Sequence, residues 1–339
     1  MPTIKDVAQR AGVSSTTVSY VLTGSRFVRP DTKARIVRAI EELDYQPNQI
    51  ARSLRAKRTM TVGMIISDIT NPFYADIVRG VEDMLSERHY SLILCNTDEA
   101  PERELAMLQM LIRKRTDGLI VVATEANAEA LRAANLAGLP IVLVDRRLPG
   151  DWLDTVLADD RQGAEIAVRH LLRLGHRRIG AIIGRAGIST TDSRQLGYEA
   201  ALVAFGVTVD PDLIQGGHST VKGGAAAARA LLDLHPRPTA IFAANNLMTL
   251  GLFLTLKEYG LRSPQDVAVA GFDDMIWLSA FVPGVTTVAQ PNYELGTRAA
   301  ELLMDRLTGP PPESPRVVVL PTRLVVRESC GCQTSRPGS

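Results

Sequence analysis

The chain has 339 residues, of which 45% are hydrophobic and 22% charged, with a net charge of +1. This length allows two or three domains, each with its own core, and the composition is typical of a soluble α/β protein. The sequence contains no apolar run that reaches the roughly 20 residues needed to span a bilayer as a helix. Residues 1–58 hold 11 Lys and Arg against 5 Asp and Glu. This basic segment predicts a polyanion partner for the N-terminal part only.

The start of the chain does not read as a secretory signal. Lys5, Asp6 and Arg10 interrupt any apolar run there. We therefore expect no signal peptide and a cytoplasmic location, with no membrane partner.

Residues 3–23 are predicted to form two short helices joined by a turn at Gly12, which suits a positive φ. Thr3 and Ser14 can cap these helices, because each hydroxyl can accept from amides of the first turn that lack partners. The outward face of the second helix is almost uncharged and consists of Ser15, Thr16, Ser19 and Tyr20. Such a face favours docking on another molecule. The alternative is a helical hairpin with no binding role.

A third helix is predicted to begin at Pro30 and Asp31. Its apolar stripe would consist of Ile36, Val37, Ile40 and Leu43. Pro47 restrains the backbone and ends this region. Residues 48–58 carry four cations in eleven positions. A free helix this short is marginal in water, so the segment can also be an ordinary basic linker.

The first two helices match a known pattern through Ile4, Asp6, Val7, Ala8, Ala11, Gly12, Val13, Ser14, Thr17, Val18 and Ser19. This run resembles the helix-turn-helix of the lactose-repressor (LacI/GalR) family of bacterial transcription regulators. The resemblance implies a DNA-binding headpiece over 1–46, a hinge helix over 47–58 and a ligand-binding and dimerisation core over 59–330. It also implies a homodimer on a palindromic operator in double-stranded DNA, and a small-molecule effector rather than a cofactor.

The resemblance assigns roles to single residues of the headpiece and hinge. Base edges would be read by Ser15, Thr16 and Tyr20, and phosphates held by Thr3, Ser14, Thr17 and Asn48. In the hinge, which includes Ala51, Leu54 would wedge between base pairs and kink the duplex. Many family members carry Arg where this chain has Tyr20. Tyr cannot read guanine bidentately as Arg does, so we expect a different base preference.

From Thr61 onward, short apolar runs alternate with helical stretches, which predicts parallel sheets covered by helices on both faces. Expected strands in the first lobe are 62–67, 92–95, 118–123 and 141–145, with helices over 73–88, 102–113 and 126–136. Expected strands in the second lobe are 179–184, 240–244 and 267–272, with helices over 193–205, 222–234 and 247–259. A last helix over 293–307 and the run 317–326 should return to both lobes and lock them together.

The predicted fold class is thus two doubly wound, Rossmann-like lobes behind an all-α headpiece. It resembles the periplasmic sugar-binding fold that the LacI/GalR family uses as its sensor. The stretches that carry this resemblance are 68–74, 175–179, 244–246, 271–274 and 286–291. The implied N-terminal lobe covers about 59–160 and 289–320, and the C-terminal lobe about 161–288 and 321–330.

A ligand is expected between the lobes, because open α/β sheets bind ligands at the carboxyl ends of their strands. Asp145, Asn245 and Asp273 follow apolar runs, and carboxylate and guanidinium groups suit the paired hydroxyls of a sugar. With the resemblance, the candidate ligand-binding residues are Asn71, Phe73, Asp145, Thr190, Arg194, His218, Asn245, Asp273 and Gln290. For three of them a plain alternative stays open: Asp273 and Asn71 can be turn residues, and His218 an exposed loop residue.

The function predicted from the sequence is a repressor whose operator affinity is controlled by a sugar or sugar derivative. One alternative is a nucleobase-responsive regulator of the same family, and another is a sugar-binding protein without a regulatory role. An enzyme is not expected. The sequence has no Gly-x-x-x-x-Gly-Lys loop, no His-Glu-x-x-His pair and no Gly-x-Ser-x-Gly elbow.

The three cysteines are Cys95, Cys330 and Cys332. An odd number in a chain of this size indicates a reducing compartment. Cys330 and Cys332 can in principle bind a metal, but no further Cys or His lies near them in the sequence. We therefore expect no metal site and a flexible tail over 331–339.

Overall fold

The computed structural model describes residues 2–23, 26–45, 58–310 and 313–332. It divides into two units, a headpiece that ends at Met60 and a core that begins at Thr61. Asn48, Ala51 and Leu54 lie outside the described residues, as does all of the predicted hinge helix except its last position. Their assigned roles stay predictions.

The headpiece has three helices, α1 (Ile4–Ala11), α2 (Ser15–Thr23) and α3 (Pro30–Glu42). Gly12 turns between the first two with a φ of 65°. The predicted cap at Ser14 is confirmed, because its Oγ accepts from the amide of Thr17 at 3.1 Å. Thr3 caps α1 as predicted, through a capping box with Asp6, to whose carboxylate its hydroxyl and amide donate at 2.8 and 2.7 Å.

The headpiece core is formed by Val7, Ala8, Ala11, Val18, Ile36, Ala39 and Tyr45. The prediction that Val37 belongs to the apolar stripe is wrong, since its side chain is 39% exposed. Successive helix positions are about 100° apart, so Val37 turns away from the face that Ile36 and Ile40 share. Of the predicted outward face of α2, Thr16 is exposed, whereas Ser15, Ser19 and Tyr20 are half-buried.

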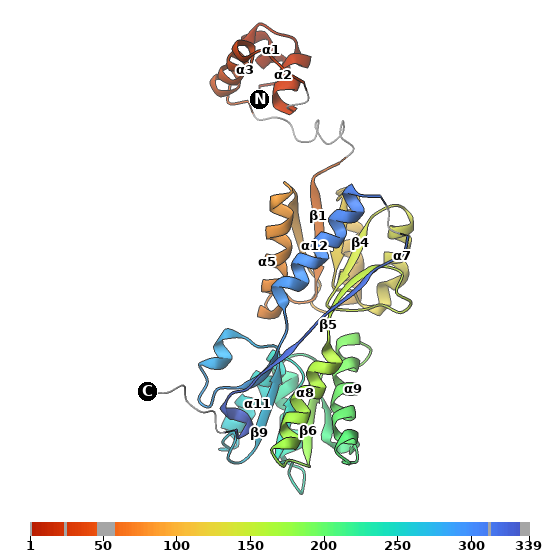
Figure 1. Ribbon diagram of the computed structural model, residues 1–339, viewed down its shortest axis with the longest axis vertical. Helices are drawn as coiled ribbons and strands as arrows, with labels where there is room; N and C mark the ends of the chain where they lie inside the picture. The colour runs from red at the N-terminus through yellow and green to blue at the C-terminus, as the bar shows by residue number, and fades with distance from the viewer. Residues whose placement is uncertain (1, 24–25, 46–57, 311–312, 333–339) are drawn as a thin grey trace. The chain divides into compact units, whose positions relative to one another are not determined.

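The N-terminal lobe is built on a fully parallel sheet in the order β11-β5-β4-β3-β1-β2. Its strands are β1 (Thr61–Ile66), β2 (Ser91–Asn96), β3 (Gly118–Val121), β4 (Ile141–Val144), β5 (Asp154–Ala158) and β11 (Val317–Leu320). Its helices are α5 (Pro72–Glu87), α6 (Pro101–Arg113), α7 (Ala128–Leu136) and α12 (Asn292–Thr308), with a short turn η1 (Glu125–Asn127). Figure 1 shows α5 and α12 side by side. They approach closely, because a Cβ added at Gly296 would strike the backbone of Ile77 in α5.

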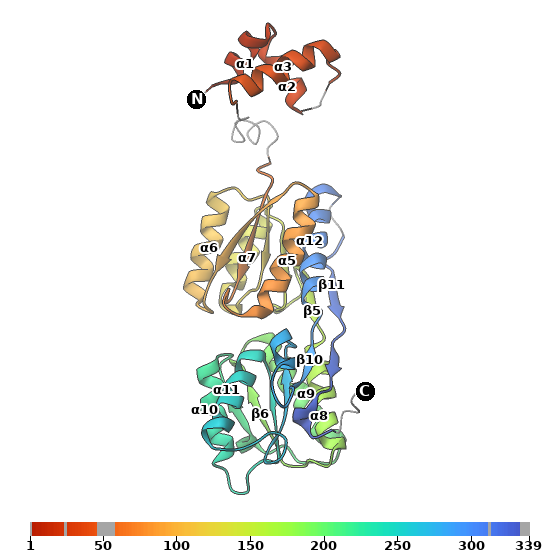
Figure 2. The same cartoon turned by 90° about the vertical axis from the view of Figure 1, so that its left-hand side faces the viewer.

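The C-terminal lobe repeats the theme with the order β12-β10-β9-β8-β6-β7, in which only β12 runs antiparallel to its neighbour. Its strands are β6 (Ile179–Ile183), β7 (Ile214–Gly216), β8 (Ala240–Ala243), β9 (Ala268–Phe272), β10 (Thr286–Ala289) and β12 (Arg323–Val325). Its helices are α8 (Asp160–Arg173), α9 (Ser189–Ala204), α10 (Val221–Leu232) and α11 (Asn246–Glu258), and its short turns are η2 (Pro211–Leu213), η3 (Ile276–Ser279) and η4 (Glu328–Cys330). Figure 2 shows the sheet between the pairs α8/α9 and α10/α11.

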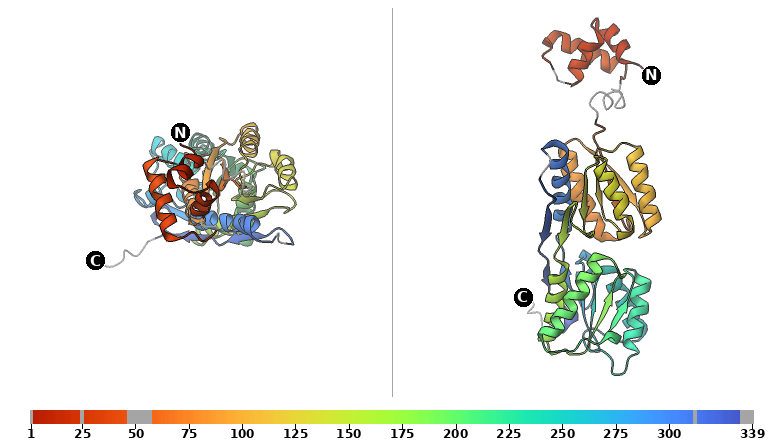
Figure 3. Two further views of the ribbon diagram at one scale, coloured as in Figure 1. Left: turned by 90° about the horizontal axis from the view of Figure 1, so that it is seen from above. Right: turned by 90° about the vertical axis from the view of Figure 1, so that its right-hand side faces the viewer.

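The chain crosses between the lobes three times, from β5 to α8, from β10 to α12 and from β11 to β12. Figure 3 follows the last crossing, in which the run 317–326 supplies one strand to each sheet. The prediction that this run returns to both lobes is therefore confirmed, as is the predicted fold class. Three crossings bring the carboxyl ends of the two sets of parallel strands toward a common cleft.

A buried carboxylate at the start of β5 ties the end of α12 to the segment before β11. Asp154 accepts from Arg306 Nε and Nη2 at 2.9 and 2.7 Å, and from the amide of Arg316 at 2.7 Å. Burial alone would raise the pKa of Asp154, but the bonds from both arginines outweigh it and hold the pKa below its ordinary 3.8.

Replacing Asp154 by Asn should lower the free energy of unfolding of the core by about 2–3 kcal/mol at pH 7. Because the pKa of Asp154 is lower in the folded protein than the 3.8 of the unfolded chain, its carboxylate stabilises the folded state at pH values above 3.8. This stabilisation is lost as the pH falls through the folded-state pKa. The difference between variant and wild type should therefore shrink in acid. Urea unfolding across the pH range measures it, with Asp151→Asn, which removes only an exposed ion pair, as the control. A difference that persists unchanged in acid would contradict the assignment.

Candidate functional site

A cavity of about 340 Å³ opens between the lobes, at the carboxyl ends of strands from both sheets. Eight of the nine predicted ligand-binding residues line it: Asn71, Phe73, Asp145, Thr190, Arg194, His218, Asn245 and Asp273. The ninth, Gln290, adjoins the cavity lining through Asp273, to whose Oδ1 it donates from Nε2 at 2.6 Å. The structure thus brings together the side chains that the sequence placed after separate strands.

Two buried carboxylates face the cavity from opposite lobes. Asp145 follows β4 and Asp273 follows β9, with φ values of 68° and 70°. The left-handed region costs a residue other than glycine about 1–2 kcal/mol, so the surrounding fold must hold both in this conformation. Burial raises the pKa of Asp145, while Arg146 and Arg194 favour its ionised form. Tyr74 donates its hydroxyl to Asp145 at 3.3 Å.

Arg194 lies in α9 and is anchored inside the C-terminal lobe. Its Nε and Nη2 each lie 2.7 Å from Oδ1 of Asp160, and Nη1 donates to the carbonyl of Ala244 at 2.7 Å. The guanidinium also stacks on the ring of Phe272, 3.9 Å from its centroid. Burial raises the pKa of Asp160 to about 7, against the opposing charge of Arg194. These contacts use only part of the guanidinium's donors, so the remainder can serve a ligand.

The other predicted residues combine a place in the cavity with a structural task. Asn245 caps α11 by accepting from the amide of Met248 at 2.8 Å. Asn71 caps α5 in the same way, accepting from the amide of Phe73 at 3.1 Å. The ring of Phe73 is buried at the cavity wall, while His218 lies exposed on a loop. The alternative explanation of Asn71 as a residue that begins a turn thus accounts for part of its role.

Direct hydrogen bonds join the two lobes at this cavity. Nδ2 of Asn246, at the start of α11, donates to Oδ1 of Asn71 at 2.8 Å. Beside a second, neighbouring pocket, the amide of Arg147 donates to Oγ of Ser189 at 3.0 Å. Asn246 is fully buried, and its own Oδ1 accepts from the amide of Leu247 at 2.8 Å. These bonds hold the lobes together.

Replacing Asn246 by Asp should weaken this closure. The new carboxylate would face Oδ1 of Asn71, and Asn71 cannot turn its amide without losing the cap on Phe73. We expect ligand binding to weaken by roughly 10- to 100-fold, which corresponds to about 1–3 kcal/mol. Calorimetric titration measures it, with Asn135→Asp in α7 as the control. Unchanged affinity in a folded variant would show that the bond between the lobes does not contribute to binding.

Sequence reasoning missed several residues in this cavity wall and behind it. Arg146 forms a buried ion pair with Glu99, and Asp160 pairs with Arg194. Arg146 directly follows Asp145 at the end of β4, so the strand-end rule could have found it. Asp160 lies two residues after β5, but the sequence did not predict that strand, so the rule was not applied there.

The face of α2 that the sequence assigns to DNA is polar and accessible. Thr16 is exposed, and the hydroxyls of Ser14 and Thr17 lie 2.9 Å apart. The guanidinium of Arg26 lies over the ring of Tyr20, 5.3 Å from its centroid. A cation therefore stands beside this face although the helix itself has none.

Among the described residues, no helix has the length and apolarity needed to cross a membrane.

A helix-turn-helix head joined to two lobes around a polar cavity defines a DNA-binding protein that responds to a small ligand. Two family models match the chain. Residues 3–48 match the bacterial regulatory proteins of the lacI family, and residues 59–328 match the periplasmic binding proteins and sugar binding domain of the LacI family. The chain belongs to the lacI family of bacterial regulatory proteins, as the sequence predicted, and is a transcriptional regulator.

Relatives match over nearly the whole chain. The HTH-type transcriptional repressor PurR of Photobacterium profundum is 37% identical over 97% of this chain and 98% of its own length. PurR of Pectobacterium carotovorum subsp. carotovorum is 38% identical over 97% of both. A solved complex of the transcriptional regulator CelR with cellobiose is 36% identical, with a TM-score of 0.74 over 97% of this chain and 100% of that one. The lac repressor dimer bound to operator and the anti-inducer ONPF is 26% identical, with a TM-score of 0.87 over 97% and 99%.

Proposed function

We propose that this regulator is a cytoplasmic repressor that binds a palindromic operator as a homodimer and whose operator affinity is set by a sugar or sugar derivative. The observation that carries the proposal is the convergence of Asp145, Asp273 and Arg194 on one cavity between the lobes. Two heads related by a two-fold axis read a palindrome, since a single three-helix head makes few contacts. The proposal assigns no catalytic residue.

The polar groups of the cavity suit a ligand rich in hydroxyls. Carboxylates accept two hydroxyl protons and a guanidinium donates to two oxygens, so each can hold a pair of neighbouring hydroxyls. Oε1 of Gln290 is buried and has no hydrogen-bond partner among the described residues. The ring of Phe73 offers an apolar surface beside these groups. A sugar presents both kinds of surface.

A nucleobase is the second candidate effector. Two relatives that are 37–38% identical over 97% of the chain carry the name PurR. Phe73 and His218 both line the cavity and can each present a ring to a planar base. The aspartates could then bind the N–H groups of the base.

The mechanism we infer is linkage between the two binding events. A ligand that contacts both lobes changes their closure, and closure changes the separation of the two heads in a dimer. Coupling free energies of such switches are about 1–3 kcal/mol, or roughly 5- to 150-fold in operator affinity. By the same linkage, operator DNA changes the affinity for the effector by an equal factor.

The test has two steps and uses the full-length protein. The first screens monosaccharides, disaccharides and purine bases by thermal shift and calorimetry, where we expect saturable binding of a sugar. Binding of a purine base alone would establish the second candidate. The second step selects bound duplexes from a random DNA pool, with and without the ligand found. Failure to enrich a palindrome under both conditions would overturn the assignment as a dimeric repressor.

A further inference from the structure

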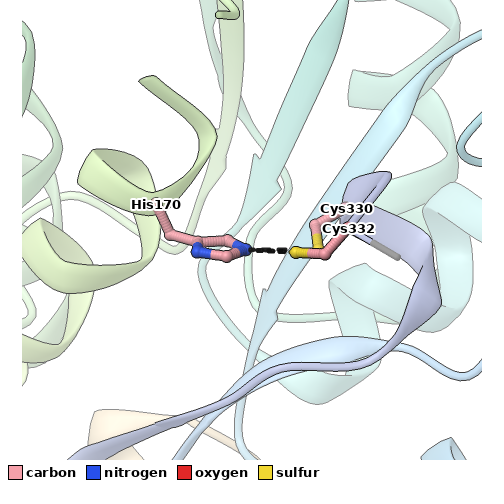
Figure 4. Close-up of side chains that lie close together, drawn as sticks. All are labelled: His170, Cys330 and Cys332. Carbon is pink, nitrogen blue, oxygen red and sulfur yellow. Dashed lines mark hydrogen bonds between the residues drawn. The ribbon is translucent and has the colours of Figure 1, made fainter. Parts of the chain in front are cut away.

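A cluster of three metal-binding side chains lies in the C-terminal lobe, apart from the cavity. Figure 4 shows the ring of His170 directed at the thiols of Cys330 and Cys332. Its Nε2 lies 3.2 Å from Sγ of Cys330 and 3.1 Å from Sγ of Cys332, and the two sulfurs are 2.9 Å apart. No histidine lies near these cysteines in the sequence, but folding brings His170 to them from 160 residues away.

The fold holds the two cysteines in place. The hydroxyl of Ser329 donates to the carbonyl of Val269 at 2.7 Å and accepts from the amide of Thr286 at 2.8 Å. Cys330 is fully buried at the end of η4. Gly331 then turns with a φ of 87°, which directs Cys332 back toward the same point. Cys332, in the predicted flexible tail over 331–339, is thus in contact with this cluster, whereas residues 333–339 lie outside the described residues.

We propose that His170, Cys330 and Cys332 bind one Zn²⁺ ion. Bonds of about 2.3 Å to sulfur and about 2.0–2.1 Å to nitrogen in a tetrahedral centre place the ligand atoms roughly 3.6–3.8 Å apart. To admit the ion, the nitrogen must move about 0.4–0.5 Å away from each sulfur, and the two sulfurs must separate by about 0.9 Å. Water completes the fourth position.

The donor set selects the kind of metal. Two thiolates and an imidazole suit Zn²⁺ and other soft ions, whereas Ca²⁺ and Mg²⁺ require oxygen ligands. The main competing use of two such cysteines is a disulfide. Nε2 of His170 contacts both sulfurs. A disulfide between the two cysteines would not use this nitrogen, whereas a bound metal ion would use it as a third ligand. The presence of a third donor favours the metal.

The zinc site would join the end of the core to α8. Helix α8 begins at Asp160, beside the cavity, and carries His170 in its last turn. Ten residues of helix at 1.5 Å each separate the two positions by about 15 Å. The site is thus distinct from the effector cavity. Because an ion that binds only the folded state stabilises it, we expect Zn²⁺ to raise the melting temperature.

The experiment uses the full-length protein, stripped with a chelator under reducing conditions and titrated with Co²⁺ and then Zn²⁺. We expect one equivalent of Co²⁺ to produce sulfur-to-cobalt charge-transfer absorption, Zn²⁺ to displace it, and the melting temperature to rise. Cys332→Ser and His170→Asn should each bind Zn²⁺ at least about 100-fold more weakly, since each loses a direct ligand. Cys332 is only partly buried, so its variant should fold, and circular dichroism checks this.

Two matched variants serve as controls. Cys95→Ser changes the third cysteine, and His89→Asn changes an exposed histidine whose φ of 60° Asn tolerates. Both should bind Co²⁺ as the wild type does. The proposal is overturned if the wild type shows no charge-transfer band with one equivalent of Co²⁺. It is also overturned if folded Cys332→Ser keeps the band, or if the stripped protein yields only a disulfide.

Discussion

Asp145→Asn is expected to weaken effector binding by roughly 10- to 150-fold, because a hydrogen bond to a charged group contributes about 1.5–3 kcal/mol. The side chain is buried at the cavity wall, and its carboxylate already accepts from Tyr74. Asn keeps the size of the residue and tolerates the φ of 68°, but it loses the charge and one acceptor oxygen. The measurement is calorimetric titration of the ligand that the screen identifies.

Asp151→Asn is the matched control for this variant. Asp151 has the same residue type, a positive φ and a position six residues from Asp145 in the chain, but it lies exposed in an ion pair with Arg147. Its affinity for the ligand should equal that of the wild type. Both variants should bind operator DNA as the wild type does when no ligand is present. Equal ligand affinity of Asp145→Asn and Asp151→Asn would exclude the carboxylate of Asp145 as a ligand contact.

The strand-end rule explains why so much of the cavity could be predicted. In a parallel sheet the carboxyl ends of the strands share one edge, so the residue after each apolar run is placed without knowledge of the tertiary structure. Asp145, Asn245 and Asp273 were found in this way. The contacts of each side chain could not be predicted in this way, because the contacting residues come from other helices and strands. Asp160, which anchors Arg194, is the clearest case.

Several elements were missed although their signals are visible in the sequence. Helix α8 buries Ala164, Ala167, Val168, Leu171 and Leu172, which recur at helical spacing. Strands β5 and β10, with five and four residues, were not predicted either, although β3 and β4 are as short and were. The sequence predicts one continuous run over 317–326, whereas Pro321 separates two strands, β11 and β12, that join different sheets. Only the tertiary structure decides that division.

The cluster of His170, Cys330 and Cys332 marks a different limit of sequence reasoning. Nothing local distinguishes His170, which lies in the last turn of a helix among basic residues. In the sequence, Cys330 and Cys332 are two thiols near the end of the chain, which are too few ligands for a metal site. A cluster of residues from segments 160 positions apart can be recognised only in the folded structure.

Thr16→Ala in the headpiece should weaken operator binding by roughly 10- to 100-fold and relax the preference at one base pair, since a base contact contributes about 1–3 kcal/mol. Thr16 is exposed on α2, on the face that also includes Tyr20. No cation is lost, so the dependence of affinity on salt should stay the same. Tyr20→Phe removes only a hydroxyl, and it should change the preference at another position if that hydroxyl reads a base. Duplex selection followed by fluorescence anisotropy measures both effects.

Thr32→Ala makes the same chemical change on α3, outside the face assigned to DNA. Its operator affinity and base preference should match the wild type. The three variants together separate two ways of docking. If Thr16→Ala loses affinity equally for all sequences, Thr16 holds a phosphate, because phosphate contacts fix register and carry no sequence information. If only Thr32→Ala loses affinity, the head presents α3 rather than α2 to the duplex, and the assignment of α2 as the reading helix is wrong.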